Sequence, residues 1–250
     1  ADCSVAMASG SQAAVQASQL VLLESDFARM PAIVKEGRQV VNNLERSGSL
    51  FLVKNIFSFI AAILSISFGM IYPLLPTQVS LVTMFTIGIP SFFLAQIPNQ
   101  NLIKGNFILN VLSKATPAAM TNVVVIWALV FVTRALHIGQ VELGMLCVLA
   151  WEVVGLVYLY RICRPFDNIW KKLIVGGCGF GMIFCMIFLQ DLFGVTFNIS
   201  YLGWIVFAIT ACLVLPAMVF FEKLLAVIYF KFFIGFVQEK IIEKKIFRKY

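Results

Sequence analysis

Six apolar segments follow one another between residues 50 and 221, and each is long enough to cross a lipid bilayer as a helix. They are Leu50–Tyr72, Gln78–Gln96, Ala119–Leu136, Glu142–Tyr160, Leu173–Gln190 and Leu202–Phe221. The hydrophobic pattern therefore predicts a mainly α-helical, polytopic membrane protein with six transmembrane helices at residues 50–221.

The first 49 residues are the only clearly polar stretch. An apolar run ending at Met7, an Ala- and Gln-rich stretch over Ser11–Ser18 and an apolar run over Gln19–Leu23 predict a strand, a helix and a strand. Two short strands do not form a stable sheet alone, so we expect residues 1–30 to be the truncated edge of an α/β domain that lies mostly upstream. The chain begins with Ala rather than Met, and we expect it to be the C-terminal piece of a longer protein.

Residues 31–49 are expected to form an amphipathic stalk helix. Pro31 suits a first helical position, and apolar residues recur at spacings of three and four. No Pro separates this helix from the run that begins at Leu50. One helix is therefore expected from Pro31 to about Tyr72, with Gly48 as its most easily interrupted position.

The basic tail at residues 222–250 leaves two interpretations open. Leu224–Val237 is apolar but short and contains Lys231. It forms either an amphipathic helix at the membrane surface or an extension of the last spanning helix.

Composition narrows the class of protein. Hydrophobic residues make up 61% of the 250 residues and charged residues 12%, whereas soluble domains have about 45–50% and about 25%. These values exclude soluble, disordered and nucleic-acid-binding proteins and indicate a lipid bilayer as the surroundings.

The net charge of +7 is unevenly placed. Residues 1–49 carry 4 basic and 5 acidic side chains, residues 50–221 carry 8 and 4, and residues 222–250 carry 7 and 3. Between the spans, Arg134 alone lies on one side, and the other side has Lys104, Lys114, Arg161, Arg164, Lys171 and Lys172. The positive-inside rule then predicts a multi-pass protein of the cell membrane with both termini in the cytoplasm.

The second apolar segment contains a candidate ion site. Pro90 cannot donate to the carbonyl of Thr86, and Gly88 loosens the same turn. Thr83 and Thr86 lie three residues apart, and oxygen ligands beside a loosened backbone suit a hard cation. The alternative is a Pro kink whose Thr hydroxyls bond back to their own helix.

Two further segments carry polar residues at spanning positions. Asn55 and Ser58 belong to a stripe of small and polar residues in the first span, which serves an ion path or helix packing. Glu152 is the only carboxylate deep in any span, and such residues usually serve ions, protons or a partner. A neutral Glu152 bonded to another helix is the structural alternative. Gly177 and Gly181 are expected to serve helix packing.

The first 45 residues also carry a family resemblance. They contain Ala-Asp at 1–2, Val-Ala-Met-Ala-Ser-Gly at 5–10, Val-Leu-Leu-Glu-Ser-Asp-Phe at 21–27, Glu-Gly-Arg at 36–38 and Asn-Asn at 42–43. This pattern resembles the end of the HAD-like phosphorylation domain and the stalk of cation-transporting P-type ATPases, in a Gram-positive bacterial branch similar to calcium and other divalent cation pumps.

The resemblance implies the membrane half of an ATP-driven cation pump, with six spans equivalent to its fifth to tenth helices. Gly88-x-Pro90 resembles a motif of the sixth helix, and Glu152 falls near a cation-binding Glu of the eighth. The ion path implied consists of Asn55, Ser58, Thr83, Thr86, Gly88, Pro90 and Glu152, with Glu152, Thr83 and Thr86 as metal ligands. Calcium pumps have Asn and Asp where this chain has Thr83 and Ile87, and a Glu near Ser58.

The resemblance also sets the expected partners and cofactors. The phosphorylated Asp, the nucleotide site and the actuator domain belong to the upstream half of the same pump, so this fragment binds no cofactor, and ATP and Mg²⁺ are implied for the complete pump. The transported cation is the expected ligand of this chain. A stand-alone ion channel or secondary carrier, and a membrane scaffold that transports nothing, are the alternatives.

Overall fold

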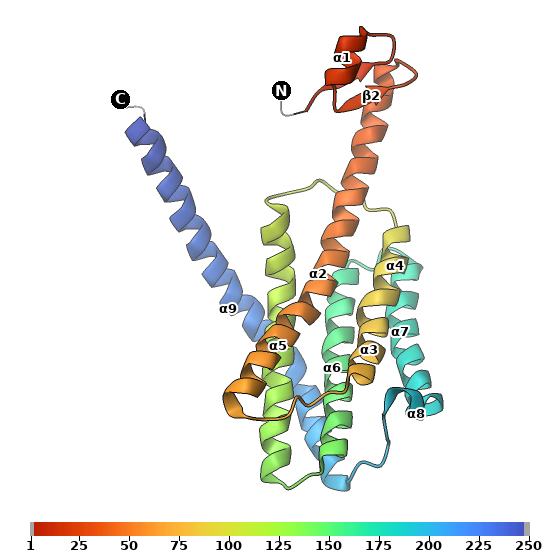
Figure 1. The fold of residues 1–250 in the computed structure, drawn as a ribbon, viewed down its shortest axis with the longest axis vertical. Coiled ribbons are helices and arrows are strands. Elements are labelled where there is room, and N and C mark those ends of the chain that lie inside the picture. The colour runs from red at the N-terminus through yellow and green to blue at the C-terminus, as the bar shows by residue number, and fades with distance from the viewer. Residues whose placement is uncertain (1–2, 248–250) are drawn as a thin grey trace. The chain divides into compact units, whose positions relative to one another are not determined.

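The computed structural model describes residues 3–247, with side chains described for residues 3–229. Within that part, six helices are long and apolar enough to cross a membrane. They lie at Phe27–Phe68, Pro76–Gln96, Phe107–Ala135, Gln140–Cys163, Ile169–Phe188 and Tyr201–Tyr229. The prediction of a mainly helical protein with six spanning helices is confirmed (Figure 1).

The chain divides into two compact units, residues 1–43 with 98–104 and residues 44–97 with 105–250. The smaller unit contains β1 (Val5–Met7), α1 (Gln12–Ala17) and β2 (Leu20–Leu22). The two strands pair in parallel, as the strand–helix–strand prediction requires. Such a small strand pair is consistent with a truncated domain.

Helix α2 (Met30–Phe68) is one continuous helix of 39 residues, preceded by a 3₁₀ turn, η1 (Phe27–Arg29). Gly48 does not interrupt it. A Cβ atom added at Gly48 would lie 3.8 Å from the Val111 side chain of α5 (Phe107–Ala135). This is an ordinary van der Waals distance, so the packing here would also accommodate a Cβ atom at residue 48.

The C-terminus of α2 lies at Phe68, earlier than the predicted end near Tyr72. Gly69 takes a left-handed conformation with a φ of 59°. The N–H of Met70 then bonds to the carbonyl of Ser65 at 3.0 Å, which closes the helix with a glycine cap.

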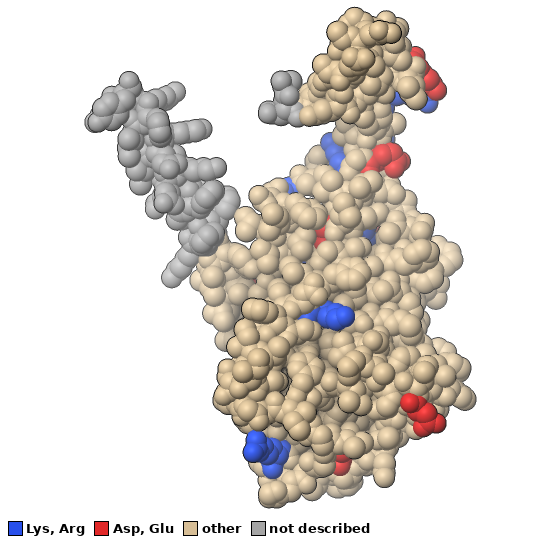
Figure 2. Space-filling view, viewed as in Figure 1, with Lys and Arg blue, Asp and Glu red and all other residues tan. Residues whose placement is uncertain are grey.

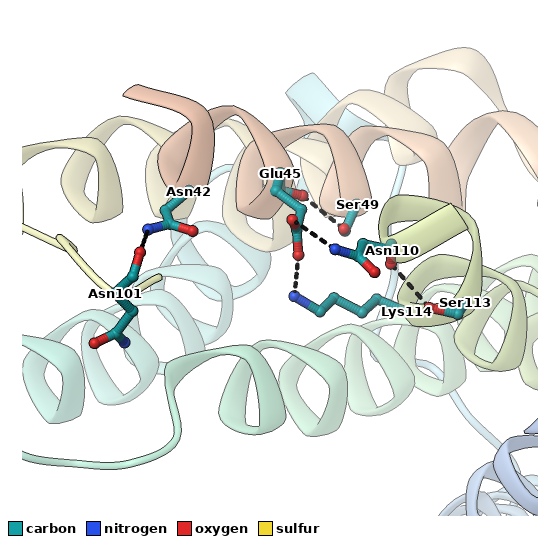
Figure 3. Close-up of polar contacts among 7 residues, drawn as sticks. All are labelled: Asn42, Glu45, Ser49, Asn101, Asn110, Ser113 and Lys114. Carbon is teal, nitrogen blue, oxygen red and sulfur yellow. Dashed lines mark hydrogen bonds and ion pairs between the residues drawn. The ribbon is translucent and has the colours of Figure 1, made fainter. Parts of the chain in front are cut away.

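In the smaller unit, the segment 98–104 lies against the first part of α2. The Asn42 side-chain Nδ2 donates to the carbonyl oxygens of Asn99 and Asn101, each at 2.9 Å. Figure 3 shows the bond to Asn101. One amide group thus holds two backbone carbonyls of a loop that has no regular secondary structure.

The larger unit is a helix bundle centred on α6. After α2 and the helices already named, its elements are α3 (Pro76–Thr83), the π-helical turn η2 (Met84–Gly88), α4 (Ile89–Gln96), α6 (Gln140–Cys163), α7 (Ile169–Phe188), the short α8 (Gln190–Phe193) and α9 (Tyr201–Phe247). Helix α6 contacts α3, η2, α5, α7 and α9. In its most apolar stretch 72% of the residues are buried, against 11% for α9. A polar side chain on α6 is therefore the one most shielded from its surroundings.

Helix α9 continues without a break from Tyr201 to Phe247. Of the two interpretations of the tail, the backbone follows the second, an extension of the last helix. The amphipathic side-chain pattern expected beyond residue 229 lies outside the residues whose side chains are described. On the face seen in Figure 2, charged side chains are few over the bundle, as a lipid-facing surface requires.

Candidate functional site

A π-helical turn, η2, interrupts the second spanning helix between α3 and α4. The N–H of Ile89 bonds to the carbonyl of Met84, five residues back rather than four. Pro90 follows at once and has no N–H, so the regular α-helical bond to Thr86 cannot form. The widened turn falls on the segment that Gly88 and Pro90 mark in the sequence. Single π turns inside α-helices are frequently found at functional sites.

The two threonine hydroxyls of this segment bond to their own helix. Thr83 Oγ1 donates to the carbonyl of Val79 at 2.8 Å, and Thr86 Oγ1 donates to that of Val82 at 2.8 Å. This is the arrangement of the Pro-kink alternative. A hydroxyl that donates its proton still has lone pairs, so each oxygen remains able to accept a cation. Thr86 is buried and Thr83 half-buried.

Helix α6 lies directly against Thr86. A Cβ atom added at Gly155 would stand 2.3 Å from Thr86 Cγ2 and 2.9 Å from Thr86 Cβ, which real contacts do not allow. The backbone of α6 therefore approaches η2 as closely as it does because residue 155 has no side chain. The sequence analysis did not single out Gly155, since only the packed helices reveal what it faces.

Glu152 lies one turn before Gly155 and hence on the same side of α6. Its residue surface is 7% exposed, and neither carboxyl oxygen has a hydrogen-bond partner among the described residues. An acidic side chain at the centre of a span costs roughly 2.5–3.5 kcal/mol on insertion scales. Burial at such a cost without a protein partner among the described residues makes Glu152 the main candidate for a ligand-binding residue in this part of the chain.

Helix α7 packs against both η2 and α6 near Glu152. A Cβ atom added at Gly181 would lie 2.5 Å from Phe85 Cε1, so α7 and η2 are in close contact. A Cβ atom added at Gly179 of α7 would lie 3.4 Å from Leu156 Cδ1, and Leu156 lies one turn after Glu152 on α6. Glu152 thus lies where α6, α7 and η2 meet. Gly177 has nothing within 4 Å of its added Cβ, so of the predicted glycine pair only Gly181 serves packing here.

A small cavity adjoins Thr86 and Gly155. Its volume is about 10 Å³, close to the space that one water molecule or ion needs. Its polar lining comes from Lys54, Thr86, Asn122 and Tyr158, on four different elements. Asn122 of α5 is completely buried, and neither its amide nitrogen nor its oxygen has a hydrogen-bond partner among the described residues.

The sequence analysis did not single out Asn122. The signal for Asn122 was present, because it is an amide side chain inside the apolar run Ala119–Leu136. The signal was ambiguous without the neighbours, since an isolated Asn in a span also serves helix packing.

Asn55 and Ser58 are not brought to Thr86. The side of α2 that is buried in the bundle carries Val53, Phe57 and Ala61, and the Phe57 ring packs on Trp151 with centroids 4.7 Å apart. Asn55 is exposed on the opposite side of α2, and the Ser58 hydroxyl interacts with Tyr72. In the described bundle these two residues therefore do not complete the group around Glu152 and Thr86.

A second polar group lies nearer the other end of α2, around Glu45. Lys114 forms an ion pair with Glu45, and Asn110 Nδ2 donates to its other oxygen at 3.3 Å. Ser49 Oγ donates to the Glu45 backbone carbonyl at 2.6 Å (Figure 3). Because the Glu45 carboxylate already has these donors, it is bound within the protein in a way that the Glu152 carboxyl is not.

Comparison with known proteins finds relatives of this chain among curated proteins. No family model matches the chain. A probable cation-transporting ATPase (exp7) of Streptococcus pneumoniae is 32% identical over 186 residues, which are 70% of this chain and 23% of that protein. The calcium-transporting ATPase CtpE of Mycolicibacterium smegmatis is 32% identical over 209 residues, 77% of this chain and 26% of that protein. The curated homologues of this chain are cation-transporting P-type ATPases.

CtpE of Mycobacterium tuberculosis, also a calcium-transporting ATPase, is 32% identical over 206 residues, 74% of this chain and 25% of that protein. The chain spans about a quarter of the length of the curated relatives that it matches. The homology and the six spanning helices together establish a multi-pass membrane protein with P-type ATPase relatives.

Proposed function

We propose that this chain forms the membrane half of an ATP-driven cation pump and carries its ion path. The single observation that supports this function most strongly is Glu152, a buried carboxyl group without a protein partner among the described residues. It lies beside a π-helical turn whose threonine oxygens keep free lone pairs. A carboxylate with several neutral oxygens is a ligand set that suits a divalent cation such as calcium.

Glu152 and Thr86 are the proposed ligands within this chain, with Thr83 as a more peripheral oxygen and with Gly88 and Pro90 shaping the turn. One carboxylate supplies one formal charge, which suits a single divalent ion. In the ion-free state Glu152 would be neutral, because a charged carboxyl group in an apolar interior is strongly disfavoured. Cation binding would then release a proton.

The energy source of the pump would lie outside this chain. None of the four Asp residues here is followed by Lys-Thr-Gly, the sequence around the phosphorylated Asp of P-type ATPases. We propose that ATP and Mg²⁺ bind to the upstream half, and that the continuous helix α2 transmits its movement to the ion site. The protein would lie in the plasma membrane, with both of its termini in the cytoplasm.

The decisive experiment measures cation-stimulated ATPase activity of the full-length pump in lipid. Glu152→Gln keeps size and hydrogen bonding but removes the charge, so the cation concentration for half-maximal stimulation should rise about tenfold or more. Glu142→Gln is the matched control, since Glu142 lies at the start of the same helix and accepts hydrogen bonds from Ser200. An unchanged cation affinity in a well-folded Glu152→Gln pump would refute the proposed site.

A further inference from the structure

A basic pocket opens at the end of the bundle where α6 ends. Its volume is about 450 Å³, and side chains from α2, α5, α6 and α9 line it. Four cationic residues contribute to its wall, namely Arg46, Lys114, Arg161 and Arg164. The hydroxyl groups of Ser49, Ser113 and Tyr229 add further polar atoms.

The positive charge of this pocket is only partly neutralised. Lys114 pairs with Glu45, and Arg161 pairs with Glu222. Arg164 has no ion pair among the described residues; its guanidinium donates to Tyr160 Oη at 2.9 Å and lies 4.8 Å from the centre of that ring. Arg164 therefore brings to the pocket a positive charge that pairs with no carboxylate among the described residues, and this charge suits an anionic ligand.

An apolar groove continues from the basic pocket along α6 and α9. This second hollow, of about 720 Å³, shares Arg161, Arg164 and Glu222 with the first. From there it extends over Leu156, Val157 and Leu215. The basic pocket matches the phosphate headgroup of a phospholipid, and the apolar groove that continues from it matches an acyl chain.

We propose that the pocket binds the phosphate headgroup of an anionic phospholipid, with an acyl chain in the groove between α6 and α9. Guanidinium groups bind phosphate oxygens in pairs, and basic pockets between spanning helices bind anionic headgroups. A soluble phosphate would use the cationic part alone and leave the groove empty, which is why the geometry favours a lipid. The lipid would bridge α6 and α9, the helix with the smallest buried share.

The test uses the purified 250-residue chain in neutral detergent and counts bound lipid by native mass spectrometry. Phosphatidylglycerol should bind at one site at least about tenfold more tightly than phosphatidylcholine, since each basic group near a headgroup contributes about fivefold. Inorganic phosphate and glycerol phosphate should compete only weakly. Equal binding of the two lipids, or competition by either soluble phosphate at the affinity of the lipid, would overturn the proposal.

Three variants separate a built site from general surface charge. Arg164→Gln should weaken phosphatidylglycerol binding about fivefold, and Ala226→Phe should abolish it by filling the pocket while every charge is kept. Lys172→Gln, an exposed basic residue at the start of α7 outside the pocket, is the matched control and should bind as the parent does. If Lys172→Gln weakens binding as much as Arg164→Gln, or if Ala226→Phe binds normally, the pocket is not the lipid site.

Discussion

Gly155 of α6 and Thr86 of η2 are in contact without room for a single additional carbon atom. A Cβ at position 155 would lie 2.3 Å from Thr86 Cγ2. The contact joins the helix that carries Glu152 to the π-helical turn that carries Thr86. Residue 155 therefore sets how closely α6 can approach this turn.

Gly155→Ala should therefore destabilise the protein, although alanine is the better helix former. Overpacking typically costs about 1–3 kcal/mol, which exceeds the roughly 0.5–1 kcal/mol that replacing a helical Gly by Ala contributes. The thermal unfolding midpoint of the purified chain shows which of these two effects is larger. Gly176→Ala is the control, because nothing lies within 4 Å of its added Cβ, and its midpoint should be equal or higher. A Gly155→Ala protein that is as stable as the parent would contradict the tight contact.

Asn122→Leu should make the ion-free protein more stable. The Asn122 amide is completely buried with no hydrogen-bond partner among the described residues, and removing such a group gains about 1–3 kcal/mol of desolvation free energy. The control is Thr121→Val, because the Thr121 hydroxyl donates to the Pro117 carbonyl at 2.8 Å and its loss should not stabilise. Unfolding midpoints in cation-free buffer compare the two. Destabilisation by Asn122→Leu would mean that its amide has a partner such as a bound water.

Lys114→Met should destabilise the protein more than the double variant Glu45→Gln/Lys114→Met. The single change leaves the Glu45 carboxylate, whose side chain is 9% exposed, with Asn110 as its remaining side-chain donor. Because Lys114 itself is half exposed, we expect a cost of about 1–2 kcal/mol rather than that of a fully buried pair. The free energies of unfolding of both single variants and of the double variant, measured in detergent, give the coupling energy between Glu45 and Lys114. A double variant no more stable than Lys114→Met would show that the pair contributes nothing.

Single cysteines introduced at Asn198 and Gln140 should react with an impermeant thiol reagent added outside intact cells. Both residues are exposed on the side with few basic residues, Asn198 between two spans and Gln140 at the first residue of α6. A cysteine at Asn106, exposed on the opposite side, should react only after the cells are opened. Mass-tag labelling and gel shift record the reaction. Labelling of Asn106 in intact cells would reverse the orientation that the basic residues predict.

The sequence was sufficient for most of the architecture because each spanning helix is a long apolar segment. The long α2 could also be anticipated, since nothing between Pro31 and Leu50 is a strong helix breaker. Its exact end could not. Gly69 takes the left-handed conformation that closes the helix, whereas Gly48 does not, and only the surrounding packing distinguishes the two.

The candidate site was harder to predict, for a related reason. Glu152 and Thr86 stand out because each is polar within an apolar segment, and both are buried. The relevant side of α2 was not predictable from its own spacing, because both the stripe with Asn55 and the side with Val53 and Phe57 fit a helical period. Gly155 and Asn122 acquire their importance from residues on other helices, which a single pattern along the chain does not contain.

The π-helical turn has a consequence for movement. A π turn accommodates one residue more than the α-helical turn that it replaces, so converting Met84–Gly88 to regular α-helix would rotate α4 relative to α3 by roughly 100°. Phe85 against Gly181 and Thr86 against Gly155 are both contacts of the present winding, and a rotation of that size cannot preserve the two together. The winding of Met84–Gly88 therefore determines which side chains of this span contact α6 and α7.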